Sequence, residues 1–103
     1  MLFRSFVHLA WRQSHADLKD LPYPLLSDIA GRLSESLGIL EPEERVCHRA
    51  VYIVDPENTV RFAAIYDMSI GRSPEEVLRV LDAMQTGELC PCNWKKGEAT
   101  LQV

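Results

Sequence analysis

The 103-residue sequence has no basic stripe and no long apolar run, and these two absences exclude several classes of function. Its formal net charge is −4 and its pI is about 5.3, so it offers no positive surface to nucleic-acid phosphates or to an anionic membrane. Its apolar stretches are far shorter than the ~20 residues that span a bilayer. Arg4, His8 and Arg12 interrupt the N-terminal segment, which makes a poor signal-peptide core. We therefore expect a cytoplasmic protein that binds neither nucleic acid nor membrane.

Cysteine is scarce, and its number is odd. A secreted disulfide scaffold normally has an even set, whereas this chain has three cysteines, two of them in Cys90-Pro91-Cys92. A disulfide between these two would be strained, because a single residue separates them. Each sulfur is better suited to pair with a distant thiol, as a resolving cysteine does in thiol–disulfide exchange. The alternative is that the cysteines are incidental free thiols.

A zinc site is a competing interpretation of the same cysteines. The further ligands would be histidines, namely His8, His15 and His48. However, no second C-x-x-C and no H-x-x-x-H motif accompanies the cysteine pair, and structural zinc sites usually show such spacing. We therefore predict no metal and no cofactor.

Residues 49–67 carry the densest β-strand signal. Residues 50–54 and 59–66 are rich in β-branched and aromatic side chains, and Asp-Pro-Glu-Asn between them favours a turn. This pattern predicts a β-hairpin. The first strand is apolar on both faces, which predicts a strand buried inside a sheet with neighbours on both edges. The second strand has Arg61 among apolar residues and is expected to form an edge.

Helical patterns lie on both sides of the hairpin. Residues 5–17 show apolar groups at helical spacing and predict an amphipathic helix. After two prolines, Leu25-Leu26 predicts a very short buried strand. Ser27 or Asp28 can cap a second helix of about ten residues, which Gly38 ends.

The last predicted helix has a complete start signal. Ser73 can cap it, Pro74 suits the first helical position, and Glu76 stands where a capping box places its carboxylate. Gly87 ends the helix, and the remainder has no periodicity and is expected to be an extended tail. The order of elements predicts an α/β fold. We divide it into a domain at 1–87 and a tail at 88–103. Because so few strands surround an apolar central strand, we expect the chain to be part of a larger domain.

The tail ELCPCNWKKGEATL resembles the C-terminal tail of typical 2-Cys peroxiredoxins, the peroxidase subunit of alkyl hydroperoxide reductase. Other family motifs occur in the same order: Phe6-x-His8-x-Ala10-Trp11, Pro24-Leu25-Leu26-Ser27-Asp28, Arg49, Val54-Asp55-Pro56 and Ile70-Gly71-Arg72-Ser73. The resemblance implies the C-terminal part of a thioredoxin-like fold. The family's peroxidatic motif, Pro-x-x-x-Thr/Ser-x-x-Cys, does not occur, so we expect the chain to correspond to the C-terminal half, without the peroxidatic cysteine.

The resemblance also implies roles for individual residues. Cys90 aligns with the resolving cysteine, which attacks the sulfenic acid on the peroxidatic cysteine of a partner subunit. Cys92 is a second candidate for that step or for exchange with the reductant. Arg49 aligns with the arginine beside the peroxidatic sulfur, where a guanidinium lowers the thiol pKa and polarises the peroxide. Arg72 aligns with a second arginine near that site. Without the match, both would be ordinary surface arginines.

The implied function is that of a thiol-dependent peroxidase that reduces hydrogen peroxide and alkyl hydroperoxides. A thioredoxin-like or flavoprotein-linked disulfide reductant would restore the thiols, and the protein would form a dimer or a ring of dimers. Residues 59–66 align with the strand through which family subunits pair edge to edge. The alternative is a non-catalytic module that pairs with a full-length peroxiredoxin and offers Cys90 as a disulfide partner.

Three remaining residues receive no catalytic role. Cys47 would share a face with Arg49 in an extended segment, but the resemblance assigns it nothing, so we interpret it as an incidental or buried thiol. Trp11 and Trp94 are expected to pack or to lie in interfaces.

Overall fold

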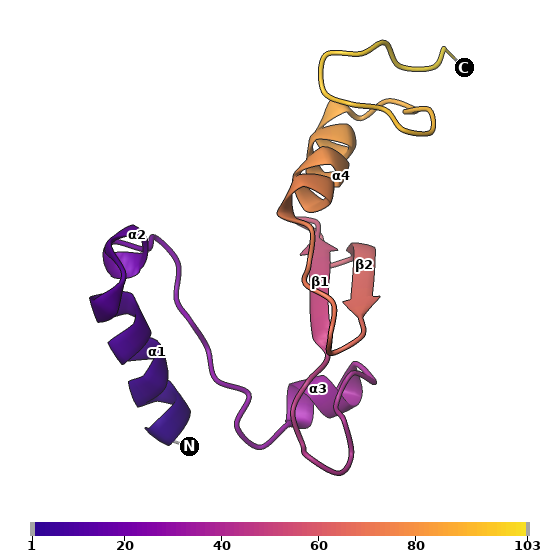
Figure 1. Ribbon diagram of the computed structural model, residues 1–103. Helices are drawn as coiled ribbons and strands as arrows, with labels where there is room; N and C mark the ends of the chain where they lie inside the picture. Colours follow the sequence, from indigo (N-terminus) through magenta and orange to yellow (C-terminus); the bar gives the residue numbers. More distant parts are fainter. Residues whose placement is uncertain (1, 103) are drawn as a thin grey trace. The chain divides into compact units, whose positions relative to one another are not determined.

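The computed structural model describes residues 2–102, with side chains from residue 7 onward. The chain forms two compact units, Met1–Cys47 and His48–Val103, which are described separately. Figure 1 shows the elements of each unit. In the described part, no helix is both long enough and apolar enough to cross a membrane.

The first unit begins with helix α1, Leu2–Ser14, followed by the short helix α2, Ala16–Lys19 (Figure 1). His15 between them has extended backbone angles, φ −120° and ψ 124°, and its ring meets that of Trp11 edge-on with centroids 6.4 Å apart. The helix predicted over 5–17 is therefore confirmed, with a break at His15.

The strand predicted at Leu25-Leu26 was wrong. These residues form no strand, and Leu26 is 84% exposed. The prediction relied on apolar character alone, but a strand needs a partner for its backbone groups. In the described chain, none pairs with this segment.

The second predicted helix is shorter than expected. Helix α3 spans only Arg32–Ser36, because Gly31 before it adopts a left-handed φ of 72°. Gly31 therefore takes the N-cap position predicted for Ser27 or Asp28. The Asp28 carboxylate still accepts hydrogen bonds from the first turn, from the backbone N–H of Leu33 at 3.2 Å and of Ser34 at 2.8 Å. Gly38, with φ 72°, follows the helix as predicted.

The second unit contains the predicted hairpin. Strand β1, Arg49–Val54, pairs antiparallel with β2, Val60–Tyr66, and a bulge after Ile53 places Val54 opposite Val60. Asp55 stabilises the turn, since its Oδ1 accepts the backbone N–H of Glu57 at 3.0 Å and of Thr59 at 2.9 Å.

The expected burial of β1 was wrong for the described chain. Only β2 pairs with it there, and all its side chains keep some exposure, because a two-stranded sheet covers one edge and neither face. Buried apolar side chains are correspondingly few among the described residues: Ile39 at 6% exposure in the first unit and Trp94 at 3% in the second.

Helix α4, Pro74–Thr86, confirms the last predicted helix. The Ser73 hydroxyl accepts the Glu76 backbone N–H at 3.4 Å, and Gly87 ends the helix with a left-handed φ of 67°. The capping box is only half formed, because the Glu76 carboxylate binds Arg79.

Candidate thiol site in the C-terminal loop

The segment predicted as an extended tail has no helix or strand of its own, but it folds back on itself. Gly87 turns the chain away from α4, and Leu89 and Leu101 then form an isolated antiparallel bridge, with the Leu101 N–H 2.7 Å from the Leu89 carbonyl oxygen. The hydroxyl of Thr100 hydrogen-bonds the Glu88 carboxylate beside this bridge. Residues 89–101 therefore form a closed loop, which we call the C-terminal loop.

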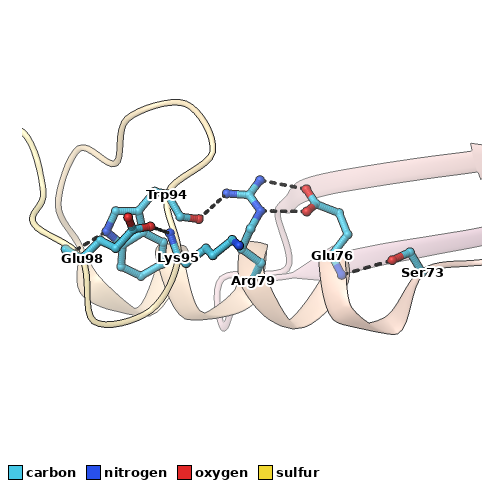
Figure 2. A network of polar contacts seen from close by, with 6 residues as sticks. All are labelled: Ser73, Glu76, Arg79, Trp94, Lys95 and Glu98. Carbon is cyan, nitrogen blue, oxygen red and sulfur yellow. Dashed lines mark hydrogen bonds and ion pairs between the residues drawn. The ribbon is translucent and has the colours of Figure 1, made fainter.

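Trp94 holds the interior of this loop. Its side chain is 3% exposed, and its indole N–H donates to the carbonyl oxygen of Glu98 at 3.0 Å (Figure 2). The Glu98 carboxylate in turn accepts the backbone N–H of Lys95 at 2.6 Å. The predicted packing role of Trp94 is thus confirmed, whereas Trp11 in the first unit is 49% exposed.

Arg79 joins the loop to α4. Its Nη1 donates to the Trp94 carbonyl oxygen at 2.9 Å, while Nε and Nη2 donate to the two carboxylate oxygens of Glu76 at 2.7 and 2.8 Å (Figure 2). The hydrogen bonds with Arg79 lower the pKa of Glu76, and the same bonds raise the pKa of Arg79.

The sequence analysis did not single out Arg79. The available signal was the three-residue spacing of Glu76 and Arg79, which places an acid and a base on one helix face. Nothing in that spacing indicates a bond to Trp94, fifteen residues away. Only the fold of the loop brings the carbonyl oxygen to the guanidinium.

The loop places its two thiols in different surroundings. Cys90 is half-buried at the C-terminal end of α4, with Sγ 3.9 Å from the Ala83 carbonyl oxygen, 3.8 Å from that of Glu88 and 3.7 Å from the Thr86 hydroxyl. These acceptors suit a resting S–H group. Cys92 is exposed. Both thiols are free, and together they line an open cavity of about 460 Å³ between the loop and α4, with Arg61 and Arg79 also in its wall.

The structure does not bring the two arginines of the predicted site to these thiols. The turn end of the hairpin shares a cavity with the C-terminal half of α4, and Arg49 lies at the opposite end of β1, about 16 Å along the strand. Arg72 directly precedes Ser73, at the end of α4 remote from Cys90, about 20 Å along the helix. Both arginines are exposed. The resemblance places both arginines beside the peroxidatic sulfur and not beside Cys90 or Cys92, so their roles stay predictions.

Cys47 lies in the first unit, where it is exposed and faces Leu40 in an isolated bridge. The interpretation of Cys47 as a buried thiol was therefore wrong. Among the described side chains, no three His, Cys, Asp or Glu residues gather closely enough to hold a metal ion.

Comparison with known proteins identifies the family. The family model described as AhpC/TSA family matches residues 4–63, which is more than half of the chain. The chain belongs to the AhpC/TSA family. The model described as C-terminal domain of 1-Cys peroxiredoxin matches residues 83–103, the region of the C-terminal loop. The predicted resemblance is confirmed.

Relatives of the chain within the AhpC/TSA family are peroxiredoxins. The chain is 51% identical over 96 residues to alkyl hydroperoxide reductase C of Mycolicibacterium smegmatis, and the match covers 93% of this chain and 49% of the relative. It is 42% identical over 97 residues to the putative peroxiredoxin YkuU of Bacillus subtilis, covering 91% of this chain and 54% of the relative. The chain thus spans about half the length of these curated relatives.

Solved structures confirm the fold class. The structure of Plasmodium vivax 2-Cys peroxiredoxin in its reduced form matches with a TM-score of 0.80 at 32% identity, over 94% of this chain and 53% of that one. Mycobacterium bovis AhpC matches with a TM-score of 0.73 at 49% identity, over 87% and 50%. The two-stranded sheet and its helices are therefore part of a thioredoxin-like peroxiredoxin fold.

Proposed function

We propose that this AhpC/TSA chain supplies the resolving thiol in the reduction of hydrogen peroxide and alkyl hydroperoxides. The observation that carries the proposal is a pair of free thiols, Cys90 and Cys92, on one hydrogen-bonded loop that lines an open cavity. The match of residues 83–103 to a peroxiredoxin C-terminal domain supports it. In this proposal, residues 1–87 are the partial peroxiredoxin domain and residues 88–103 are the resolving tail.

The proposed chemistry requires two partners. A peroxide oxidises the peroxidatic thiolate of a full-length peroxiredoxin chain to a sulfenic acid and leaves as an alcohol or water. Cys90 then attacks that sulfur, so that a disulfide forms and the sulfenic oxygen leaves as water. A dithiol reductant, thioredoxin-like or linked to a flavoprotein, takes up the disulfide by exchange and is itself oxidised. This chemistry suits a reducing, cytoplasmic compartment and an assembly of several subunits.

Arg49 and Arg72 have a place in this proposal at the peroxidatic sulfur. Both are exposed, Arg49 at the start of β1 and Arg72 just before the capping residue of α4, so their guanidinium groups are free to approach another chain. A guanidinium fixed beside a thiolate stabilises that anion and polarises the peroxide oxygen. The distance of both residues from Cys90 agrees with a division of labour between two chains.

A second candidate is a non-catalytic module that pairs with a full-length peroxiredoxin. The outer edge of β2 favours it, because only β1 pairs with this strand in the described chain, and Val60 and Ile65 on β2 are 52% and 57% exposed. Unpaired backbone groups on such an edge can bind a strand from another chain. In this case Cys90 forms a mixed disulfide that is not turned over.

The test combines this chain with a full-length peroxiredoxin whose own resolving cysteine is replaced by serine. We expect the chain to restore peroxide consumption in a thioredoxin-coupled assay, and a mixed disulfide to appear on non-reducing gels. Cys90→Ser should abolish both, whereas Cys92→Ser should keep the mixed disulfide. A mixed disulfide without turnover would favour the non-catalytic module.

The chain alone provides the control. We expect no peroxide consumption above buffer without the full-length partner, and no effect of Cys47→Ser. Turnover by the chain alone that Cys47→Ser abolishes would show that Cys47 acts as the peroxidatic thiol, and would refute the assignment of the chain as a resolving partner.

A further inference from the structure

Arg79 fixes the backbone of the C-terminal loop at one point. Its guanidinium bonds the Trp94 carbonyl oxygen, while the Trp94 indole is buried and bonded to Glu98 (Figure 2). The backbone and the side chain of Trp94 are therefore both held. The Glu76 carboxylate keeps the guanidinium in place through two parallel bonds, a geometry that suits arginine.

The two thiols lie between this point and the Leu89–Leu101 bridge. The backbone N–H of Trp94 donates to the Pro91 carbonyl oxygen, with 3.2 Å between nitrogen and oxygen, so Cys92 lies within a turn. With both ends of the segment held, Cys90 faces the end of α4 and Cys92 faces solvent. If the loop were released at Trp94, the two cysteines would move together in one mobile segment, because only Pro91 separates them. The difference in exposure between the two thiols would then be lost.

We propose that Arg79, held by Glu76, is a positioning residue for the two thiols. By fixing the loop at Trp94, it keeps Cys92 exposed, so that a reactant from solution meets this thiol first, and it keeps Cys90 shielded. Its catalytic meaning rests on the proposed function: Cys90 is kept for the sulfenic acid of the partner, and Cys92 is offered to the reductant. The arrangement of the two thiols rests on the geometry alone.

The variant Arg79→Lys separates geometry from charge. Lysine keeps the positive charge, but its single ammonium group cannot bond both carboxylate oxygens and the Trp94 carbonyl oxygen in one fixed fork. Glu76→Gln tests the same geometry from the other side, because it leaves Arg79 without its charged partner. Glu75→Gln is the matched control: the same change one residue away, in the same first turn of α4, on an exposed side chain.

The experiment measures the alkylation rate of each cysteine by iodoacetamide, followed by peptide mass spectrometry over a range of pH. In the unmodified sequence we expect Cys92 to react roughly tenfold faster than Cys90, because Cys92 is exposed and Cys90 is half-buried. Loss of a hydrogen bond to a charged group in a variant is sufficient to change the ratio by about that factor. Arg79→Lys and Glu76→Gln should bring the ratio of the Cys92 rate to the Cys90 rate close to one. The same change should be seen at the plateau of the pH–rate profile, where the rates no longer depend on pH. Glu75→Gln should keep the ratio.

Cys47 serves as an internal reference, because it lies in the other unit. Cys47 is also exposed, so its rate should be the same in all variants and corrects for differences in reagent and handling. Unchanged helical circular dichroism shows that a changed ratio does not come from unfolding. If Arg79→Lys does not fold, Glu76→Gln decides alone. An unchanged ratio in folded Glu76→Gln overturns the proposal. An unchanged ratio in folded Arg79→Lys overturns it too, because a positive charge without the fixed hydrogen bonds would then be sufficient to keep the two thiols apart in reactivity.

The assay with the full-length partner keeps this proposal separate from the proposed function. No mixed disulfide in that assay, together with a ratio that Arg79→Lys abolishes, refutes the proposed function and supports the positioning role. A mixed disulfide through Cys90, together with a ratio that no variant changes, supports the function and refutes the positioning role.

Discussion

The hairpin and the C-terminal loop of the second unit both reverse the chain, but they are held in different ways. The hairpin is held by a ladder of backbone pairs from Arg49↔Tyr66 to Val54↔Val60. The loop has a single backbone bridge and two short backbone turns, and is otherwise held by the side chains of Trp94, Arg79, Glu98 and Thr100. A ladder draws on groups that every residue has, so it tolerates substitution. The loop depends on particular side chains, and single substitutions should release it.

The largest expected difference comes from Trp94→Ala. Truncating a buried tryptophan costs about 3–5 kcal/mol, and here the indole bond to Glu98 is lost as well. We expect the Leu101 amide to lose its protection from hydrogen exchange, while the amides of β1 keep theirs. Trp94→Phe, which retains most of the packing, should have a smaller effect. Equal loss of protection in both regions would show that loop and hairpin open as one unit.

A moderate effect is expected where each region uses a left-handed residue. Gly87 at the end of α4 has φ 67°, and Asn58 in the hairpin turn has φ 64°. A Cβ at Gly87 would meet no atom within 4 Å, so Gly87→Ala adds only backbone strain, about 1–2 kcal/mol. Thermal unfolding should show a lower Tm for this variant. Gly87→Asn should lower it less, because asparagine tolerates this conformation.

Asn58→Gly is the matched change in the hairpin, and it should leave the Tm nearly unchanged, since glycine also adopts this φ. A Gly87→Ala variant as stable as the unmodified sequence would contradict the view that α4 must end in this conformation for the loop to return.

The contrast between the two regions also explains what could be predicted from the sequence. The hairpin and α4 were predictable, because β-branched runs, turn residues and the Ser73 cap act locally. The strand at Leu25-Leu26 and the burial of β1 were not, because each depends on partners that the described chain does not supply. In the candidate site, Cys90 and Cys92 were found by their spacing and resemblance. Arg79 was missed, because its bond to Trp94 exists only after the loop has closed.

The smallest expected effect is a difference in pH dependence. The Arg79 guanidinium lowers the pKa of Glu76 below its ordinary value of 4.5, and the Thr59 backbone N–H is the main cause that lowers the pKa of Asp55 below its ordinary value of 3.8. A carboxylate with a lowered pKa contributes stability that is complete above the unfolded value and is lost as the pH falls through the folded value. On acidification the loop should therefore begin to loosen at a higher pH than the hairpin turn.

Trp94 fluorescence can report this loosening locally. In a Trp11→Phe background, which leaves Trp94 as the only tryptophan, its emission should shift to the red as the pH falls below about 4.5. The shift should be small, because the Glu76 side chain is 45% exposed and water and salt screen its pair with Arg79. Glu76→Gln should remove the pH dependence and Glu75→Gln should keep it. A shift that persists in Glu76→Gln would contradict the assignment of the acid sensitivity to Glu76.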